Sequence, residues 1–327
     1  MSPSFNSFRR SLLFGTLLLG FKDCALSAPL IKKTIRLIVP FPPGGATDIM
    51  ARGIAQGLAS ELEQSVIVEN KGGAGGSIAA EWVAHATPDG TTLLFTTMGI
   101  MSINPSLYPK LKYDPIKDYT AISLTHLTPR VVVVNSALPI KTVADLIAYS
   151  QRNPGQLTYG SAGNGSSSHL SGALFENLAK IDLLHIPYKG SALLLIDLLA
   201  GRVNMAFDAY AVYEEHIKSG KLRLIAITSK KRMPWLPNTP TVSESGLPSY
   251  EVANWLGVVA PSGLPSDIAK SIHTALVKIM SSNSLKQQLF ELGIEPTSST
   301  PEEFTSIIQS ENIKWAEIIK KMNVRID

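Results

Sequence analysis

Cysteine and charge are scarce in this sequence, and each scarcity removes a class of protein. The single cysteine is Cys24, inside a segment that we expect to be removed. The mature chain would then hold no disulfide, no thiolate nucleophile and no cysteine metal site. Charged residues make up 17% of the chain and the formal net charge is only +4, which is too weak to indicate a nucleic-acid partner. A hydrophobic content of 45% argues against disorder.

Catalytic and cofactor motifs are also lacking. The stretch GSAGNGSS (160–167) has the glycine spacing of a phosphate loop but no lysine before its serines, and it is not G-x-S-x-G. In GGAGG (72–76), Ile78 stands where a dinucleotide fingerprint needs its third glycine. The six histidines show no metal-ligand spacing. We therefore predict no enzyme, no cofactor and no metal.

The N-terminus has the pattern of a secretory signal. Two arginines precede the apolar stretch SLLFGTLLLGF (11–21), and the small residues of ALSA (25–28) follow it. The stretch is too short to favour a stable membrane span. Cleavage near Ser27/Ala28 would remove a net charge of +2, contributed by Arg9, Arg10, Lys22 and Asp23, and leave +2 of the original +4. We expect residues 1–27 to be a signal peptide and the mature protein to be exported.

Short apolar runs alternate with helical patterns along the rest of the chain. Continuous apolar runs predict strands buried on both faces, and their alternation with helices predicts an α/β fold with mostly parallel strands. We expect two such sheets in two lobes, joined by two crossovers near 129 and 252: 28–129 plus 253–327, and 130–252. The predicted strands are 34–41, 65–70, 91–97, 130–135, 156–162, 183–188, 203–209, 221–228 and 255–261, and the clearest predicted helices are 47–63, 141–150, one that opens at 265–267, and 299–322.

A strand followed by a small-residue loop and a helix start occurs four times. The loops are PFPPGGATD, FTTMG (95–99), YGSAGNGSSSHL (159–170) and IPYKGSA (186–192). Glycine permits close approach of the backbone, and a helix N-terminus offers unpaired N–H groups and the positive end of a dipole. The four loops predict a pocket for a small anion, above all a carboxylate. The alternative at each loop is a helix cap without a ligand.

A series of motifs in order resembles the tripartite tricarboxylate transporter receptor family, also called the Bug family. Among them are IRLIVPFPPGGATDIMAR, GAGGSIAAEWVAHATPDGTTLL, INPSLYPKLKYDPIKDY, LTYGSAGNGSSSHL, HIPYKGSA and PTVSESGLPSYEVANWLGVVAPSGLP. The resemblance runs from about Ile35 to the C-terminus. It implies a two-lobed, hinge-closing periplasmic binding protein of the type II-like kind. Such a protein would pass a carboxylate or an amino acid to a membrane permease with a large and a small subunit.

The resemblance also implies which residues bind the ligand. Two loops would face each other across the cleft, with further residues on its walls. Asp48 is expected to cap its helix or to position a bridging water rather than to touch an anion. The candidate ligand-binding residues are Phe41, Pro43, Gly44, Gly45, Ala46, Thr47, Asp48, Thr97, Met98, Ser161, Ala162, Gly163, Asn164, Gly165, Ser166, His169, Tyr188, Lys189, Gly190 and Asp208.

Three residues depart from what the resemblance leads us to expect. Met98 and Met101 stand in a segment that usually carries a small residue and a histidine. They would favour a bulkier acid if they faced the cleft, or else they pack in the core. Arg130 lies at the predicted crossover, where it could pair with a second carboxylate or point to solvent.

Two other functions stay open at this point, beside that of a monomeric transport receptor. The same fold could present its closed form to a sensor kinase. The chain could also be an exported hydrolase that uses Ser161 and His169.

Overall fold

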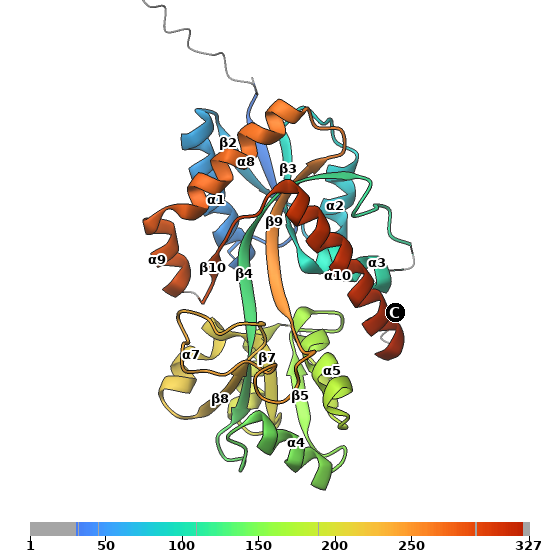
Figure 1. Cartoon of the computed structure of the whole chain (residues 1–327), viewed down its shortest axis with the longest axis vertical. Helices are drawn as coiled ribbons and strands as arrows, with labels where there is room; N and C mark the ends of the chain where they lie inside the picture. Colours follow the sequence, from blue (N-terminus) through green and yellow to red (C-terminus); the bar gives the residue numbers. More distant parts are fainter. Residues whose placement is uncertain are drawn as a thin grey trace, which may run out of the picture.

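In the computed structural model of the chain, the described residues are 31, 33–44, 46–108, 110–188, 190–291 and 293–322. The expected signal peptide, residues 1–27, and two candidate site residues, Gly45 and Lys189, lie outside them. The helices and strands form two groups, one above the other in Figure 1, which we name the upper and the lower group. No helix of the described chain combines the length and the apolarity needed to cross a membrane.

The upper group combines the first and the last thirds of the chain (Figure 1). Its elements are β1 (Ile35–Val39), α1 (Ala46–Leu62), β2 (Val66–Asn70), the short helix η1 (Ala74–Gly76), α2 (Ser77–Ala84), β3 (Thr92–Thr97), the π-helical turn η2 (Gly99–Ile103), α3 (Asn104–Leu107), β9 (Ala253–Pro261), α8 (Ser266–Ser281), α9 (Asn283–Glu291), β10 (Glu295–Pro296) and α10 (Pro301–Met322).

The lower group is continuous in sequence. It contains α4 (Val143–Arg152), β5 (Thr158–Ser161), α5 (Ser167–Ala179), β6 (Leu184–Pro187), α6 (Ser191–Leu199), β7 (Met205–Ala209), α7 (Tyr210–Lys218) and β8 (Leu222–Ile227). The long strand β4 (Tyr119–Asn135) belongs to both groups: residues 119–129 pair with β9, and residues 130–135 pair with β7 and β8.

The two sheets predicted from the sequence are joined into one. The strand order is β2-β1-β3-β9-β4-β7-β5-β6, and β8 and β10 also pair with β4. The strands β1, β2 and β3 run parallel to one another, as do β5, β6 and β7. Every pairing of β4, and that of β9 with β3, is antiparallel. The sheet is therefore mixed rather than mostly parallel, because one long strand passes through both groups.

All nine predicted strands are present, but β4 is much longer than the predicted 130–135. Its first part alternates with polar residues, which conceals it from a search for apolar runs. Ser123, Thr125 and His126 in this part are buried, and the Thr125 hydroxyl donates to the carbonyl oxygen of Leu256 at 3.1 Å. Pro129 lies in the strand where its partner changes from β9 to β7 and β8, a position that tolerates a missing N–H group.

Alternating side chains divide the core between the two faces of the sheet. In β1, Ile35 and Leu37 pack against α1 and α8, whereas Ile38 faces α2. The cluster that contains Ile38 continues through Val132 and Val134 of β4 to α4 and α5 in the lower group. The neighbouring side chains of β4 face a third cluster, formed with α6 and α7. One face of the sheet thus carries a core that is shared by both groups.

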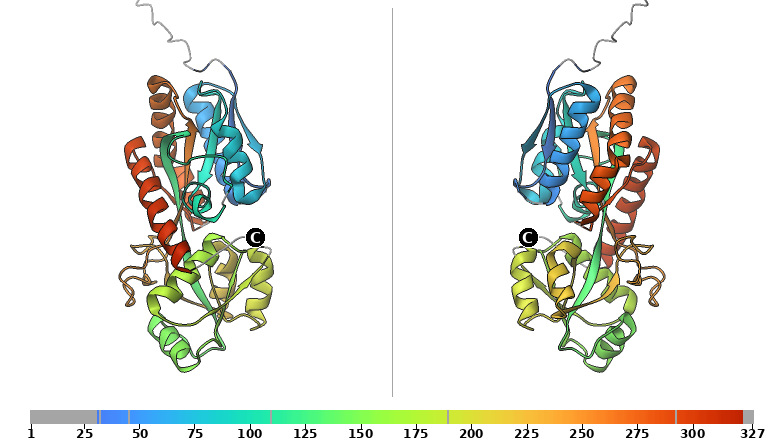
Figure 2. Two further views of the ribbon diagram at one scale, coloured as in Figure 1. Left: turned by 90° about the vertical axis from the view of Figure 1, so that its right-hand side faces the viewer. Right: turned by 90° about the vertical axis from the view of Figure 1, so that its left-hand side faces the viewer.

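Helix α10 lies over this shared core and slants toward the lower group (Figure 2). A capping box opens the helix: the Glu303 N–H donates to the Thr300 hydroxyl, and the Thr300 N–H donates to the Glu303 carboxylate. Farther along, Asn312 donates to the carbonyl oxygen of Met101 at 2.7 Å, and the Lys314 ammonium donates to that of Glu251 at 2.9 Å. The helix therefore touches both the upper group and the segment that returns from the lower group.

Candidate ligand-binding cleft

A cleft of about 620 Å³ lies between the upper and the lower group, bordered by the joining strands β4 and β9. Most of its lining is apolar or small, and among these lining residues only Arg130 and Asp208 carry a full charge at neutral pH. The lining consists of Phe41, Thr47, Ile49, Met50, Gly75, Thr97, Gly99, Asn104, Leu107, Tyr108, Thr128, Pro129, Arg130, Ala162, Gly163, Asn164, Gly165, Ser166, Ser167, Ser168, Ser191, Asp208, Ala209, Tyr210, Ala211, Val212, Asn254, Leu256, Gly293 and Ile294.

Four helices contribute N-terminal residues to this lining. Thr47 is the second residue of α1, and Ser167, Ser191 and Tyr210 are the first residues of α5, α6 and α7. The first N–H groups of a helix have no partner within it, and that end of the helix dipole is positive. The cleft therefore favours an anion over a cation.

Asp48 does not line the cleft but fixes the loop that does. Its carboxylate is 2% exposed and accepts hydrogen bonds from the Gly44 N–H at 2.9 Å and from the Arg52 guanidinium at 2.9 and 3.1 Å. Asn70 donates both to Asp48 and to the carbonyl oxygen of Phe41. The Arg52 bonds, followed by the Gly44 bond, lower the pKa of Asp48 to about 2. Asp48 thus acts as an ionised brace, in agreement with the expected capping role.

The second loop folds back on itself and presents its backbone to the cleft. Gly163 and Gly165 have positive φ angles of 136° and 72°, which a side chain would strain. The Ser166 hydroxyl caps α5 by accepting from the His169 N–H, and it donates to the carbonyl oxygen of Gly163. The Ser168 hydroxyl accepts from the Ala162 N–H at 2.9 Å. All residues from Ala162 to Ser168 line the cleft.

Ser161 and His169 lie behind this loop rather than in the cleft. The Ser161 side chain is fully buried, and its hydroxyl faces Nε2 of His185 at 2.7 Å. His169 instead accepts the Gly165 N–H on Nδ1 and stacks on His185. Ser161 therefore pairs with a different histidine from the one proposed for a hydrolase, and its hydroxyl is not presented to the cleft. The expectation that Ser161 and His169 touch a ligand is not supported by their positions.

Met98 and Met101 are both fully buried in the core shared by the two groups. They do not line the cleft, so they do not enlarge or reshape it for a bulky acid. Thr97 does line it, and its hydroxyl lies 3.4 Å from the Ile100 N–H. The loop FTTMG (95–99) was expected to contribute to the pocket, but only Thr97 and Gly99 of it line the cleft.

Of the predicted residues outside the two loops, Asp208 lines the cleft, whereas Tyr188 and Gly190 do not. The Tyr188 hydroxyl donates to Asp197 at 2.8 Å, away from the cleft. Gly190 has a φ of 109° and caps α6, whose first residue, Ser191, reaches the lining. Asp208 lines the cleft as expected, and Arg130 lies beside it with Nη1 at 3.8 Å from Oδ1. Arg130 therefore faces the cleft rather than bulk solvent.

The predicted residues that line the cleft are Phe41, Thr47, Thr97, Ala162, Gly163, Asn164, Gly165, Ser166 and Asp208. The predicted residues that do not line it are Pro43, Gly44, Asp48, Met98, Ser161, His169, Tyr188 and Gly190, while Ala46 begins α1.

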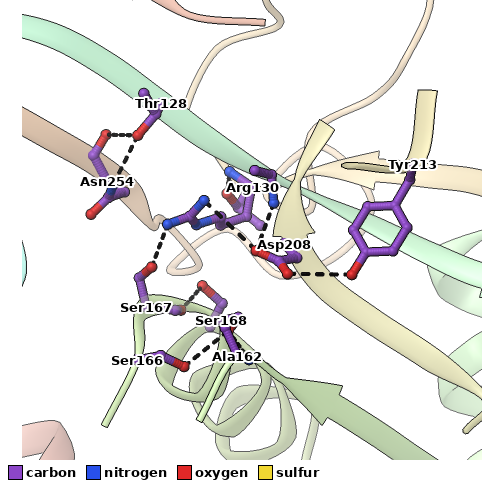
Figure 3. A network of polar contacts seen from close by, with 12 residues as sticks. Thr128, Arg130, Ala162, Ser166, Ser167, Ser168, Asp208, Tyr213 and Asn254 are labelled. Carbon is purple, nitrogen blue, oxygen red and sulfur yellow. Dashed lines mark hydrogen bonds and ion pairs between the residues drawn. The ribbon is translucent and has the colours of Figure 1, made fainter. Parts of the chain in front are cut away.

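Sequence reasoning missed the residues at the junction of the two groups. Thr128 and Asn254 face each other on β4 and β9, with the Asn254 side-chain amide donating to the Thr128 hydroxyl at 2.8 Å (Figure 3). Tyr210 and Val212, at the start of α7, were also missed. The one available signal was position: Thr128 and Asn254 lie within two residues of a predicted crossover, and Tyr210 and Val212 lie within three residues of the end of the predicted strand 203–209.

The chain matches known proteins over most of its length. Residues 50–324 match the model of the family described as "Tripartite tricarboxylate transporter family receptor". It is 36% identical to a Rhodopseudomonas palustris protein solved with adipate, with a TM-score of 0.78 over 90% of this chain and 98% of that one. It is 34% identical to periplasmic binding protein BugD, with a TM-score of 0.74 over 90% and 99%. It is 31% identical to MatC of Rhodopseudomonas palustris with bound malate, with a TM-score of 0.73 over 88% and 99%.

Proposed function

Because the chain belongs to the tripartite tricarboxylate transporter receptor family of solute-binding proteins, we propose that it captures a small organic acid in its cleft for a membrane permease. The observation that carries this function is the lining itself. Four helix N-termini and one arginine surround an otherwise largely apolar space. Such a site favours a carboxylate.

The ligand class follows from the same lining. Apolar side chains such as Phe41, Ile49, Leu107 and Ile294 would contact a carbon chain, while the helix N-termini hold its charged ends. Two relatives of similar fold were solved with adipate and with malate, both dicarboxylates. We propose a dicarboxylate for this chain, with an apolar middle that favours adipate over malate.

The proposed mechanism is closure of two lobes over the ligand. The lobes would comprise residues 28–129 with 253–327, and residues 130–252. In support, β4 and the segment entering β9 pass between the groups at Pro129–Arg130 and Val252–Ala253. Contacts made only in the closed state would then shift the population toward closure.

The proposed context is export as a monomer after removal of residues 1–27, with large and small permease subunits as partners. A sensor kinase remains the alternative partner, since it could recognise the same closed form. The neighbouring genes distinguish the two: permease subunits favour transport, and a kinase with a regulator favours sensing.

Isothermal titration of the mature protein with adipate, malate and the uncharged 1,6-hexanediol tests the proposal. We expect adipate to bind, to raise the thermal midpoint and to be recovered unchanged, and the diol to have no effect. A wider panel of mono-, di- and tricarboxylates follows if adipate fails. No binding across that panel, or conversion of any member to a product, would contradict the proposed function.

A further inference from the structure

Arg130 is fixed at the point where the chain passes between the two groups. Its N–H donates to the Thr228 hydroxyl at 2.8 Å, and its carbonyl oxygen accepts the Thr228 N–H at 2.9 Å. The Thr228 hydroxyl in turn donates to the carbonyl oxygen of Val252 at 2.7 Å. Thr228 therefore ties both crossing segments together, at Arg130 on β4 and at Val252 before β9. Its side chain is anchored to the junction, not to a loop.

The guanidinium of Arg130 is buried with most of its donors unused (Figure 3). The side chain is only 14% exposed. Nη2 donates to the Ser167 hydroxyl at the start of α5, Nε has no protein partner, and Nη1 reaches Asp208 only at 3.8 Å. A guanidinium carries five N–H donors and stays charged in proteins. A buried charge of this kind is costly unless further acceptors reach it, and the cleft is the side from which a ligand could supply them.

Asp208 is held in place independently of Arg130. Its Oδ1 accepts the Ala209 N–H at 2.8 Å, and its Oδ2 accepts the Tyr213 hydroxyl at 3.3 Å (Figure 3). Burial raises the pKa of Tyr213, so that its hydroxyl stays protonated and can donate. Asp208 is thus a fixed anion beside Arg130. Each of its carboxylate oxygens already accepts a hydrogen bond from another residue. It offsets the arginine charge without saturating the arginine donors.

We propose that Arg130 and the N-terminus of α5 bind one carboxylate of the ligand, and that Asp208 is a built-in counter-ion that limits the affinity for this carboxylate. This inference rests on the proposed function. It predicts that Arg130 strengthens ligand binding and that Asp208, its neighbour in space, weakens it. The ligand carboxylate would accept from the free Nη hydrogens of Arg130 and from N–H groups in the first turn of α5. Asp208 keeps the empty site from holding an uncompensated charge, and it repels the anion when it arrives.

The variants Arg130→Gln and Asp208→Asn test this by titration with adipate. Arg130→Gln is expected to weaken adipate binding by about tenfold to a hundredfold, since a charged hydrogen-bonded pair is lost. Asp208→Asn keeps one acceptor oxygen for the Ala209 N–H, places an amide NH2 that can donate to the Tyr213 hydroxyl oxygen, and removes the repelling charge. It is expected to tighten adipate binding by roughly threefold or more, and to steepen the loss of affinity with added salt.

A similar trio elsewhere in the lower group supplies matched controls. Asp197 accepts from Arg202 and from the Tyr188 hydroxyl, as Asp208 does from Tyr213, but none of the three lines the cleft. Arg202→Gln and Asp197→Asn change the same charges and should leave adipate affinity within about twofold of the unaltered protein. Thermal midpoints without ligand report whether each variant folds. If Arg130→Gln does not fold, Arg130→Lys keeps the charge but loses the forked donors, and it should still weaken binding.

The outcomes separate this inference from the proposed function. Failure of the unaltered protein to bind any carboxylate removes the function. Normal binding by the unaltered protein with Arg130→Gln within twofold of it removes Arg130 from recognition and leaves the function intact. Weaker binding in both Arg130→Gln and Asp208→Asn overturns the counter-ion role. Weaker binding by Arg130→Gln and tighter binding by Asp208→Asn, with unchanged affinity in the two control variants, support the proposal. Loss of structure would instead weaken binding by both variants.

Discussion

Two stacked imidazoles support the second cleft loop from behind. The rings of His169 and His185 lie 3.9 Å apart and nearly parallel, at 9°. His169 accepts the Gly165 N–H on Nδ1, which requires an unprotonated nitrogen. Burial lowers the pKa of both histidines to about 4. The loop geometry therefore depends on two neutral rings, and protonation would place like charges in contact.

Acidification is expected to destabilise the protein well before its carboxylates titrate. The unfolded chain binds protons at these histidines near pH 6.5, whereas the folded chain does so only near pH 4. The stabilisation from neutral His169 and His185 is thus complete above pH 6.5 and is lost as the pH falls toward 4. Thermal midpoints at pH 7.5, 6.5, 5.5 and 4.5 should decrease, by about 2–4 °C per kcal/mol lost.

The variant His185→Gln is the control for this pH dependence. It keeps a polar partner for Ser161 but cannot be protonated, so the decrease with pH should be shallower. The decrease should persist in part, because burial also lowers the pKa of His126, to about 3. A midpoint that is constant or higher at pH 5.5 than at 7.5 would rule out this account.

Single residues were the least predictable level from sequence. The loops were located correctly because glycine, proline and hydroxyl residues mark turns and caps whatever the surroundings. Which side chains of a loop face the cleft depends on hydrogen bonds that close in space. Asp48 is turned away from the cleft because it is hydrogen-bonded to Arg52 and Asn70. Ser161 is turned away because it is hydrogen-bonded to His185. Arg130 faces the cleft because Ser167 and Asp208 converge on it from distant segments.

At the level of elements, two glycines of α1, Gly53 and Gly57, differ in the space around them. A Cβ at Gly57 would lie 2.7–2.9 Å from three side-chain atoms of Ile279, so α8 packs directly on this glycine. A Cβ at Gly53 would meet only Leu285, at an ordinary 3.7 Å. Both glycines lie within the helix and have no positive φ angle. Close approach between α1 and α8 therefore depends on one glycine and not on the other.

Substitution of these two glycines by alanine should move stability in opposite directions. Gly53→Ala should stabilise the protein by roughly 0.5–1 kcal/mol through helix propensity. Gly57→Ala should lose that gain to overpacking and destabilise the protein by roughly 1–3 kcal/mol. Denaturant unfolding measures both differences, and each variant is the control for the other. Equal shifts of the same sign would show that the packing of α1 on α8 does not discriminate between the two sites.

The elements themselves were predicted well where the pattern is local. The apolar faces of α8 and α10 are buried as expected, with Ile272 and Trp315 fully so. What could not be predicted was the course of β4. Its first part carries buried polar residues whose partners lie on β9, more than 120 residues away. Neither periodicity nor composition records such a partner, so one strand was interpreted as a loop followed by a short strand.

At the scale of the whole molecule, the two groups are connected more firmly than a pair of linkers would connect them. They share β4, a continuous core on one face of the sheet and the contacts of α10 with Met101 and Glu251. The opposite side carries the cleft. A closing motion would therefore bend the sheet near Pro129 and Arg130, with the cleft side approaching and the α10 side remaining packed.

Distance measurements between spin labels can detect this motion. A chain that begins at Ala28 contains no cysteine, so Ile78→Cys and Leu193→Cys introduce unique labels in it. Both positions are exposed, at 52% and 50%, and they lie in the upper and the lower group respectively. Adipate should shorten the distance between them. The pair Ile67→Cys and Ile78→Cys, within the upper group, should keep its distance.

An unchanged distance between positions 78 and 193, in a sample where titration shows that adipate is bound, would contradict lobe closure.

The position of β9 in the sheet also sets an order for folding. It lies between β3 and β4, so one edge of β3 and the first part of β4 lack their β9 pairing until residues 253–261 arrive. The lower group needs no strand later than β8 and can assemble from a continuous stretch of chain. The upper group instead waits with β3 unpaired on one edge, and its pairing spans more than 150 residues, which slows folding. The group that begins the chain is therefore the last to be completed.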